Sequence, residues 1–450
     1  MLDSELFLMA MTFFVVITIM LWRPFDVNET IPTSAGAVFV LALGIVPLAD
    51  IKDIFNIVSG ASLTILSTIM MSIVLDSIGF FKWIALNIII RSKGSGRHLF
   101  FYVILLCFFM TMFFNNDGSI LITTPIIIHI MLLLKMKPKQ AFPYLISGAL
   151  IATAASAPIA VSNISNLIAL KIVGLSLNSY IEMMFVPSLA GILLIALMLY
   201  VYFHGDIPRK IPILQLKWNR STNNIKLDHP LKLTDTNEKV DWWLFKVCLS
   251  IVVITRAGFF LLSPLGVPIE WVGLSGAFLL ILIRWFRTKD GIMDIVKKTP
   301  WHILLFAFNM YVLVYGLKNV GLNELIVVYL KEIVTENHFY ASMVMGLFLT
   351  ILSNIMNNLP AVMIGTLSIT EMGLDHKTMQ IAYLANVIGS DIGSLLTPVG
   401  TLATLIWMFL LKRHNVHISW RQYMKVTFIV IPIGLVASLL FLYLWNSWLF

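Results

Sequence analysis

The sequence predicts an all-α polytopic membrane protein made of two inverted repeats. The prediction rests on a composition suited to lipid, on apolar runs long enough to cross a bilayer, and on landmarks that recur at a constant spacing. Of the 450 residues, 59% are hydrophobic and 12% are charged, and the mean hydropathy is +0.91. Soluble domains keep roughly a quarter of their residues charged. We therefore expect lipid to be the solvent of this chain.

Ten apolar runs have the length of full membrane spans. They cover about residues 6–22, 33–49, 61–79, 143–170, 181–204, 242–264, 268–286, 300–318, 378–411 and 422–447. Acidic Asp3 and Glu5 precede the first run, where a signal peptide would carry basic residues. The first run is therefore expected to be a span and not a removable signal.

Two further regions, about 98–134 and 338–372, each hold two apolar arms that meet at a polar tip. The tips read Asn115-Asn116-Asp117-Gly118 and Asn357-Asn358-Leu359-Pro360. Each region could be a pair of ordinary spans or a re-entrant helical hairpin. Because an unsatisfied polar cluster is costly in lipid, we favour re-entrant hairpins.

The placement of lysine and arginine orients the chain, because cytoplasmic loops carry the positive charge. Most of the 31 Lys and Arg residues fall on one predicted face. That face is expected to be cytoplasmic and to hold the polar linker 205–241, with both termini on the outside. The net charge of +8 is then a topology signal, and we expect no nucleic-acid partner.

Landmarks of the first half recur in the second half. Leu75-Asp76-Ser77-Ile78-Gly79 aligns with Leu317-Lys318-Asn319-Val320-Gly321 at a spacing of 242, and the two Asn-Asn tips are also 242 apart. Each half, 1–204 and 242–450, holds five spans. An odd number turns the second copy upside down, which is an architecture of secondary transporters with a solute site near the midplane.

Two of the predicted spans, 143–170 and 378–411, contain polar breaks. The first break runs from Thr153 past Pro158 to Asn166, and the second runs from Gly389 past Pro398 to Thr401. Proline removes a helical donor, so each break could free backbone groups for a ligand. The alternative is a simple proline kink relieved by Ser and Thr hydroxyls.

Few ionisable residues lie in the apolar regions. Asp391 is the predicted site of proton or cation coupling, and Asp117 is predicted to cap the first tip and to bind both solute and coupling ion. Asp76 is expected at the membrane interface, whereas Arg256 could reach outward or pair with an anion. The predicted solute-binding residues are Asn115, Asn116, Asp117, Ser162, Asn163, Asn357, Asn358, Thr397, Gly400 and Thr401.

Other classes of protein fit less well. Cys107 and Cys248 are expected to be buried thiols, and we expect neither a metal site nor a cofactor. Gly273-Leu274-Ser275-Gly276, with His302 downstream, formally matches a rhomboid-like serine protease. Small residues at helix contacts explain that motif better, so no enzyme is expected. A passive channel would not need a coupling carboxylate.

These motifs resemble the bacterial arsenite/antimonite efflux permeases, the arsenical pump membrane proteins of the ion transporter superfamily. The most specific stretches are Phe114-Asn115-Asn116-Asp117-Gly118, Ile355-Met356-Asn357-Asn358-Leu359-Pro360, Ala385-Asn386-Val387-Ile388-Gly389-Ser390-Asp391-Ile392-Gly393 and Thr397-Pro398-Val399-Gly400-Thr401. The resemblance implies export of trivalent arsenic or antimony hydroxide through the bacterial plasma membrane. Export would be proton-coupled or assisted by a separate cytoplasmic ATPase subunit, and a homodimer is a further candidate assembly.

The chain departs from that family pattern at both breaks. The family usually has an aspartate at the position of Thr153 and a Pro-Lys pair at Ser394-Leu395. This chain could therefore couple differently or move another solute. The alternative function is a cation-coupled antiporter, or an organic or inorganic anion carrier, of the same superfamily. A neutral trihydroxide fits the hydroxyl and amide groups of the breaks, whereas a dicarboxylate would want more positive charge.

Overall fold

The computed structural model describes residues 2–24, 27–212, 217–218, 225–226, 241–289 and 291–449. Much of the predicted linker 205–241 lies outside these residues. The α-helices are α1 (Leu2–Trp22), α2 (Thr30–Ala42), α3 (Asp50–Ser77), α4 (Phe80–Arg91), α5 (Gly96–Phe113), α6 (Asn116–Leu133), α7 (Pro138–Ala154), α8 (Ile164–Val173), α9 (Leu177–Phe203), α10 (Trp242–Leu262), α11 (Ile269–Thr288), α12 (Met293–Lys298), α13 (His302–Asn319), α14 (Leu322–Glu336), α15 (His338–Met356), α16 (Asn358–Glu371), α17 (His376–Asp391), α18 (Leu402–Arg413) and α19 (Trp420–Leu449). Short 3-10 turns are η2 (Ala160–Ser162), η3 (Ser263–Leu265) and η4 (Gly393–Leu396), and β1 (Lys217–Trp218) pairs antiparallel with β2 (Ile225–Lys226).

The predicted all-helical membrane fold is confirmed. Within the described residues, ten helical stretches are long and apolar enough to cross a membrane. They are Glu5–Trp22, Asp50–Ser77, Gly96–Phe113, Asn116–Leu133, Leu177–Phe203, Trp242–Leu265, Ile269–Thr288, Met293–Asn319, His338–Met356 and Trp420–Leu449. Three of these are hairpin arms. The runs 143–170 and 378–411 are instead each divided into two helices, by the breaks that the sequence predicts.

One expected span is shorter than predicted. The run 33–49 forms only the 13-residue helix α2, which ends at Ala42. Gly44 takes a left-handed conformation with φ of 72°, and its N–H bonds back to Leu41 O at 3.1 Å. The next N–H, of Ile45, bonds to Val40 O at 3.2 Å. This glycine-terminated turn stops the helix although apolar residues continue beyond it.

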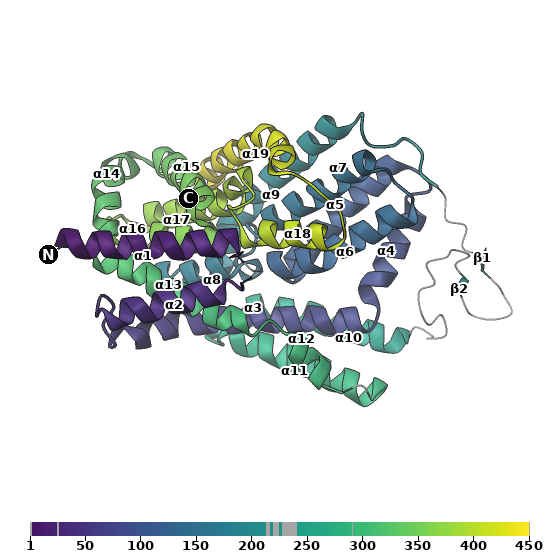
Figure 1. Ribbon diagram of the computed structural model, residues 1–450, viewed down its shortest axis with the longest axis horizontal. Helices are drawn as coiled ribbons and strands as arrows, with labels where there is room; N and C mark the ends of the chain where they lie inside the picture. The colour runs from purple at the N-terminus through teal and green to yellow at the C-terminus, as the bar shows by residue number, and fades with distance from the viewer. Residues whose placement is uncertain are drawn as a thin grey trace.

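Two corresponding helices of the halves, α4 and α14, lie toward opposite ends of the molecule (Figure 1). Helix α4 lies near the end that carries β1 and β2, whereas α14, its counterpart at a spacing of 242, lies at the other end beside the N-terminus. Both helices begin after a left-handed glycine, Gly79 with φ of 80° and Gly321 with φ of 89°. The shared geometry at opposite ends fits the predicted inverted repeat.

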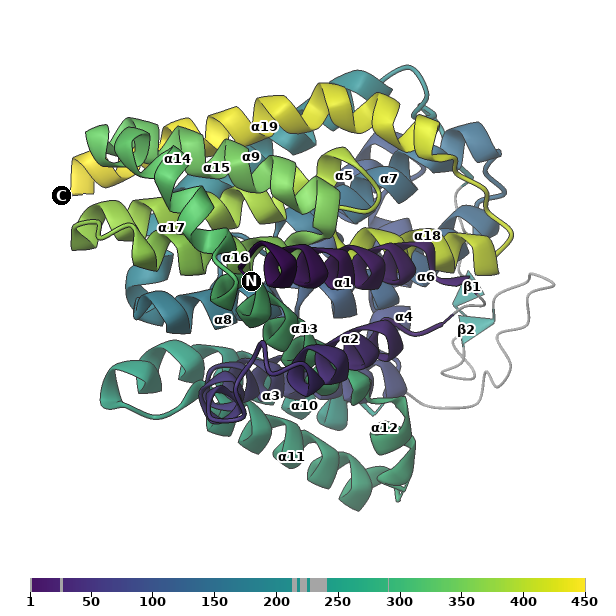
Figure 2. The same cartoon turned by 60° about the vertical axis from the view of Figure 1, so that its left-hand side comes forward.

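The halves also exchange elements in the interior. Helix α8, the second part of the first broken helix, packs on α16, the return arm of the second hairpin. Helix α18 packs in the same way on α6, the return arm of the first hairpin. Long α9 and α19 lie side by side, as Figure 2 shows, and α3 packs on α11. Neither half therefore forms its core alone.

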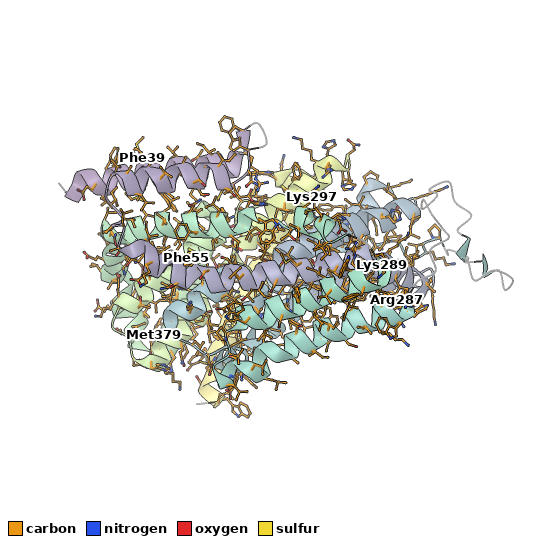
Figure 3. All side chains as sticks on the ribbon, turned by 90° about the horizontal axis from the view of Figure 1, so that it is seen from below. Phe39, Phe55, Arg287, Lys289, Lys297 and Met379 are labelled. Carbon is orange, nitrogen blue, oxygen red and sulfur yellow. The ribbon has the colours of Figure 1, made fainter. Side chains whose placement is uncertain are left out.

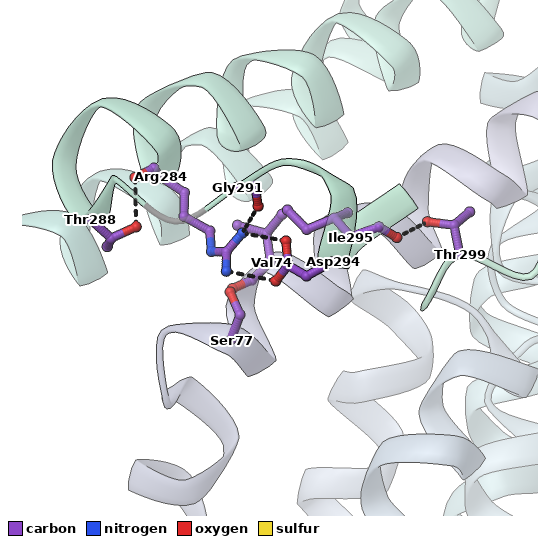
Figure 4. Close-up of polar contacts among 8 residues, drawn as sticks. All are labelled: Val74, Ser77, Arg284, Thr288, Gly291, Asp294, Ile295 and Thr299. Atoms are coloured by element: carbon purple, nitrogen blue, oxygen red, sulfur yellow. Dashed lines mark hydrogen bonds and ion pairs between the residues drawn. The ribbon is translucent and has the colours of Figure 1, made fainter. Parts of the chain in front are cut away.

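Charged residues gather at the end that holds α4 and the C-terminal ends of α9 and α11, which we call the basic end. Arg287 and Lys289 lie there, away from Phe39 and Met379 (Figure 3). Arg284 forms a bidentate pair with Asp294, whose closest approach is 2.7 Å, beside the end of α3 (Figure 4). Arg287 Nε donates to Asp241 Oδ2 at 2.6 Å. This hydrogen bond is the main reason why the pKa of Asp241 is lowered.

Candidate functional site

The carboxyl of Asp391 lies at the centre of the molecule, where the two broken helices meet. Asp391 is fully buried and is the last residue of α17. Ser156 Oγ and Asn166 Nδ2 each donate to its Oδ2 at 2.7 Å. Asn163 Nδ2 donates to its Oδ1 at 2.8 Å. These three donors belong to the first break, so side chains 225 to 235 residues away in sequence surround Asp391.

The charge of Asp391 has no nearby compensation from a cation. Its donors are neutral hydroxyl and amide groups, and none of the ion pairs seen among the described residues includes it. The C-terminal end of a helix also disfavours negative charge. A buried carboxylate in such a place is costly unless a proton or a cation joins it. The arrangement is therefore suited to reversible binding of a proton or cation.

Tyrosines support the backbone of both breaks. Tyr180 of α9 donates to Ala157 O at 2.6 Å, and Tyr423 of α19 donates to Leu395 O at 3.0 Å. Tyr383 of α17 donates to Asn166 O at 3.0 Å. All three tyrosines are fully buried. Carbonyls that lose their helical partners are thus satisfied by neighbouring helices, which holds the uncoiled segments in place.

The first hairpin tip is capped by Asn115 and not, as predicted, by Asp117. Asn115 Oδ1 accepts from the Gly118 N–H, and its Nδ2 donates to Thr68 Oγ1 of α3 at 3.3 Å. Asp117 falls in the first turn of α6, too late in the chain to cap it. Asn116 is buried, and its Oδ1 accepts from the Asp117 N–H at 2.8 Å. Asp117 itself is half-buried in the first turn of α6.

Arg256 follows neither of the two alternatives drawn from the sequence. It is 7% exposed, so it does not reach outward, and no acid pairs with it among the ion pairs of the described residues. Its Nε and Nη2 instead donate to the carbonyls of Phe113 and Phe114 at the end of α5. The guanidinium also lies 5.4 Å from the ring centroid of Phe259. Arg256 thus fixes the first tip to the middle of α10, a position that favours a re-entrant hairpin.

The second hairpin tip lies against the second break. Asn357 has a φ of 80°, and its Nδ2 donates to Val399 O at 3.2 Å. Asn354, one turn earlier, donates to Gly393 O at 2.9 Å and accepts from the Thr397 N–H at 2.8 Å. Asn358 is buried as the first residue of α16. Asn354 and Asn357 therefore satisfy three backbone groups of the second break.

Gly400 and Thr401 shape the start of α18. A side chain at Gly400 would place its Cβ 1.9 Å from Ser394 O, so only glycine fits there. Thr401 is the N-cap of α18, and its Oγ1 accepts from the Thr404 N–H at 3.0 Å. The two residues return the chain from the break into a helix. The last two residues of the Thr-Pro-Val-Gly-Thr motif therefore have a structural role.

Several polar atoms around the breaks have no hydrogen-bond partner among the described residues. They are Ser162 Oγ, Asn166 Oδ1, Ser394 Oγ and Thr397 Oγ1. Buried polar groups are nearly always satisfied by protein, water or ligand. These atoms, two on each break, are the groups that a small hydroxylated solute or water could bind.

Sequence reasoning omitted several residues from its predicted site. Ser156 and Asn166 lie inside the predicted first break, so their position was a usable signal. Asn354 is a polar residue in an apolar arm one turn before a tip, which is a weaker signal. The buried tyrosines gave no signal, because an aromatic residue in a membrane helix is ordinary.

The family model described as "Arsenical pump membrane protein" matches residues 8–446. The chain belongs to this family. The resemblance predicted from the motifs is therefore confirmed.

Individual members of the arsenical pump family match along nearly their full length. A putative arsenical pump membrane protein of Bacillus subtilis is 46% identical over 442 residues, covering 98% of this chain and 100% of that protein. The arsenical pump membrane protein of Escherichia coli K12 is 32% identical, covering 93% and 94%. The Yersinia enterocolitica protein of the same name is 32% identical, covering 94% and 95%.

Membership makes the chain a multi-pass membrane transport protein and not a classical enzyme. The protease-like motif has a structural explanation. Ser275 Oγ donates to Val272 O of its own helix at 2.9 Å. His302 lies instead 3.7 Å from the Glu29 carboxyl, measured from Nε2 to Oε1.

Proposed function

We propose that this protein exports arsenite and antimonite from the cytoplasm as neutral trihydroxides, in exchange for protons. The observation that carries the proposal is the buried carboxyl of Asp391, held by three neutral donors of the opposite broken helix. A proton on this carboxyl removes the uncompensated charge. Protonation therefore changes the energy of the surrounding contacts, which is what coupling requires.

The polar groups of the breaks suit a neutral trihydroxide. Such a solute donates and accepts hydrogen bonds, and hydroxyl and amide groups do both. Ser162, Asn163, Thr397 and Thr401 supply these groups, and the tips add Asn115, Asn116, Asn357 and Asn358. A site of three thiolates is not available, because Cys107 and Cys248 are the only cysteines and lie on different helices, α5 and α10.

In this proposal the protein spans the bacterial plasma membrane and moves the solute outward from the cytoplasm. The basic end faces the cytoplasm of a bacterial cell, because lysine and arginine concentrate there. In this proposal Asp117, at the first tip, shares the coupling role with Asp391. A separate cytoplasmic ATPase subunit would bind at the basic end, and assembly as a homodimer is part of the same proposal.

The departures at Thr153 and Leu395 keep a cation-coupled carrier as the second candidate. Thr153 Oγ1 is bonded to Ala149 O at 3.2 Å and adds no charge to the site. The Asp391 carboxylate and Asn166 Oδ1, which has no partner among the described residues, offer oxygen ligands for a sodium ion in place of a proton. A flux that needs sodium and ignores antimonite would select this candidate.

The test of export is made in a bacterium that lacks its own arsenical efflux. Cells expressing the chain should hold less antimonite than control cells, and the Asp391→Asn variant should remove the difference. The matched control is Ser275→Ala, because the Ser275 hydroxyl donates to a carbonyl of its own helix. This variant should export normally. Equal antimonite in cells with and without the protein would overturn the proposal.

A further inference from the structure

A largely apolar cavity with a few polar groups lies at the basic end. It is a cavity of about 380 Å³ between the end of α3, helix α4, helix α6 and the residue that follows α18. Its polar groups are Asp76, Lys82, His129 and His414, and its other walls are apolar. Nothing derived above assigns this cavity a task.

Two helices connect the cavity with the candidate site. Helix α6 begins at the first tip and contributes Pro125, His129 and neighbouring residues to the cavity. Helix α18 begins at Leu402, directly after its cap Thr401, and ends just before His414. Residues seven and eleven positions apart share a helix face, so Gly118 of the first tip lies on the same side of α6 as Pro125 and His129. The cavity is therefore the outer end of a surface that leads to the hairpin tip.

The corresponding place in the second half is bridged by an ion pair. At the spacing of 242, Asp76 corresponds to Lys318 and His129 corresponds to Glu371. Lys318 Nζ lies 3.5 Å from Glu371 Oε1, which ties the end of α13 to the end of α16. No such pair joins Asp76 to His129 among the ion pairs of the described residues. The Lys318–Glu371 pair thus bridges one end of the molecule, whereas the cavity occupies the matching place at the basic end.

We propose that this cavity is the vestibule through which the neutral trihydroxide reaches the site from the basic end, and that Asp76 and His129 close it when the carrier opens to the other side. The inference rests on the proposed function. In an alternating carrier only one end is open at a time. The Asp76 carboxylate and a protonated His129 imidazolium can form an ion pair across the cavity. Lys318 and Glu371 form the corresponding ion pair at the other end.

The vestibule is tested by modifying a cysteine placed in its wall. In a background with Cys107→Ala and Cys248→Ala, Ile126→Cys lines the cavity, and Lys139→Cys, an exposed position outside the cavity, is the control. A charged, membrane-impermeant methanethiosulfonate is applied to the basic end in everted vesicles, and the excess is removed before antimonite is added. We expect at least tenfold slower antimonite uptake for Ile126→Cys and no change for the control.

Two results would overturn the vestibule. One is complete modification of Ile126→Cys, shown by mass spectrometry, with an unchanged rate of uptake. The other is a cysteine that the aqueous reagent does not reach, as expected if lipid fills the cavity. Unchanged protein that moves no antimonite into the same vesicles would instead count against the proposed function, so the two failures are distinguishable.

The closing pair is tested by exchanging it for the pair of the other end. Asp76→Lys alone should slow antimonite uptake several-fold, because a lysine then faces His129 and Lys82. Adding His129→Glu recreates the Lys318–Glu371 arrangement and should restore most of the rate. Rates are divided by the amount of protein in the vesicles. The uptake rates of Asp76→Lys and His129→Glu, each relative to the unchanged protein, are multiplied to give the rate expected without interaction. A double variant no faster than this product would show that Asp76 and His129 do not meet.

Discussion

At the scale of single residues, the surroundings of Asp391 decide what its carboxyl can do. Ser156, Asn163 and Asn166 offer only donors to its oxygens. Donors favour the ionised carboxyl, whereas burial and the helix end favour the protonated one. Opposing effects of this kind allow a small change, such as the arrival of a solute, to shift the protonation state.

Removing one donor should therefore weaken coupling more than folding. A hydrogen bond to a charged group is worth about 1.5–3 kcal/mol, or roughly 10- to 100-fold in an equilibrium. The Asn166→Ala variant is expected to move the pH at which antimonite uptake is half-maximal to higher values, because the ionised form loses a stabilising contact. The measurement is uptake against pH in everted vesicles. Asn446→Ala, which removes an equally buried amide far from Asp391, is the control. An unchanged profile for Asn166→Ala would count against the assigned role.

Arg256 gives a prediction about stability. Replacing it with glutamine leaves the carbonyls of Phe113 and Phe114 short of donors, and each unsatisfied buried group costs about 1–3 kcal/mol. A lysine at this position would offer a point charge without the fork of two donors. The melting temperature in detergent should therefore be highest for the unchanged protein, lower for Arg256→Lys and lowest for Arg256→Gln. A melting temperature of Arg256→Gln equal to that of the unchanged protein would contradict this account of the first tip.

At the scale of elements, the second break depends on close backbone contact. Gly400 lies where a Cβ would come 1.9 Å from Ser394 O, and both atoms belong to the uncoiled segment. Gly400→Ala must displace that segment and so the Thr397 groups. We expect transport to fall at least tenfold while the protein still inserts into the membrane. Gly205→Ala is the control, since a Cβ there meets no atom within 4 Å. Normal uptake by Gly400→Ala would show that the break tolerates movement.

Most elements could be predicted from apolar runs and polar interruptions. The hairpin tips and the two breaks were visible because Asn, Asp and Pro are rare in such runs. The early end of α2 was missed, because a left-handed Gly44 stops the helix while hydropathy stays high. The choice of Asn115 over Asp117 as cap was missed because either residue type can cap a helix, and only the backbone register decides.

At the scale of the whole molecule, the site exists only where the two halves meet. Asp391 belongs to one half and its donors belong to the other. Motifs of the sequence identified both segments, and their convergence was expected from the inverted repeat. The pairing of Asp391 with Asn163 and Asn166 could not be read from the sequence, since it depends on how two uncoiled segments face each other. The same holds for Arg256, whose partners are backbone carbonyls that no motif records.

In the proposed mechanism, proton movement through Asp391 drives solute transport across the membrane. Proteoliposomes that hold the purified chain allow antimonite uptake to be measured under an imposed pH gradient. We predict that the unchanged protein accumulates antimonite against its concentration gradient and dissipates the pH gradient. Asp391→Asn should do neither. Gradient-driven accumulation by Asp391→Asn at the rate of the unchanged protein would contradict this mechanism.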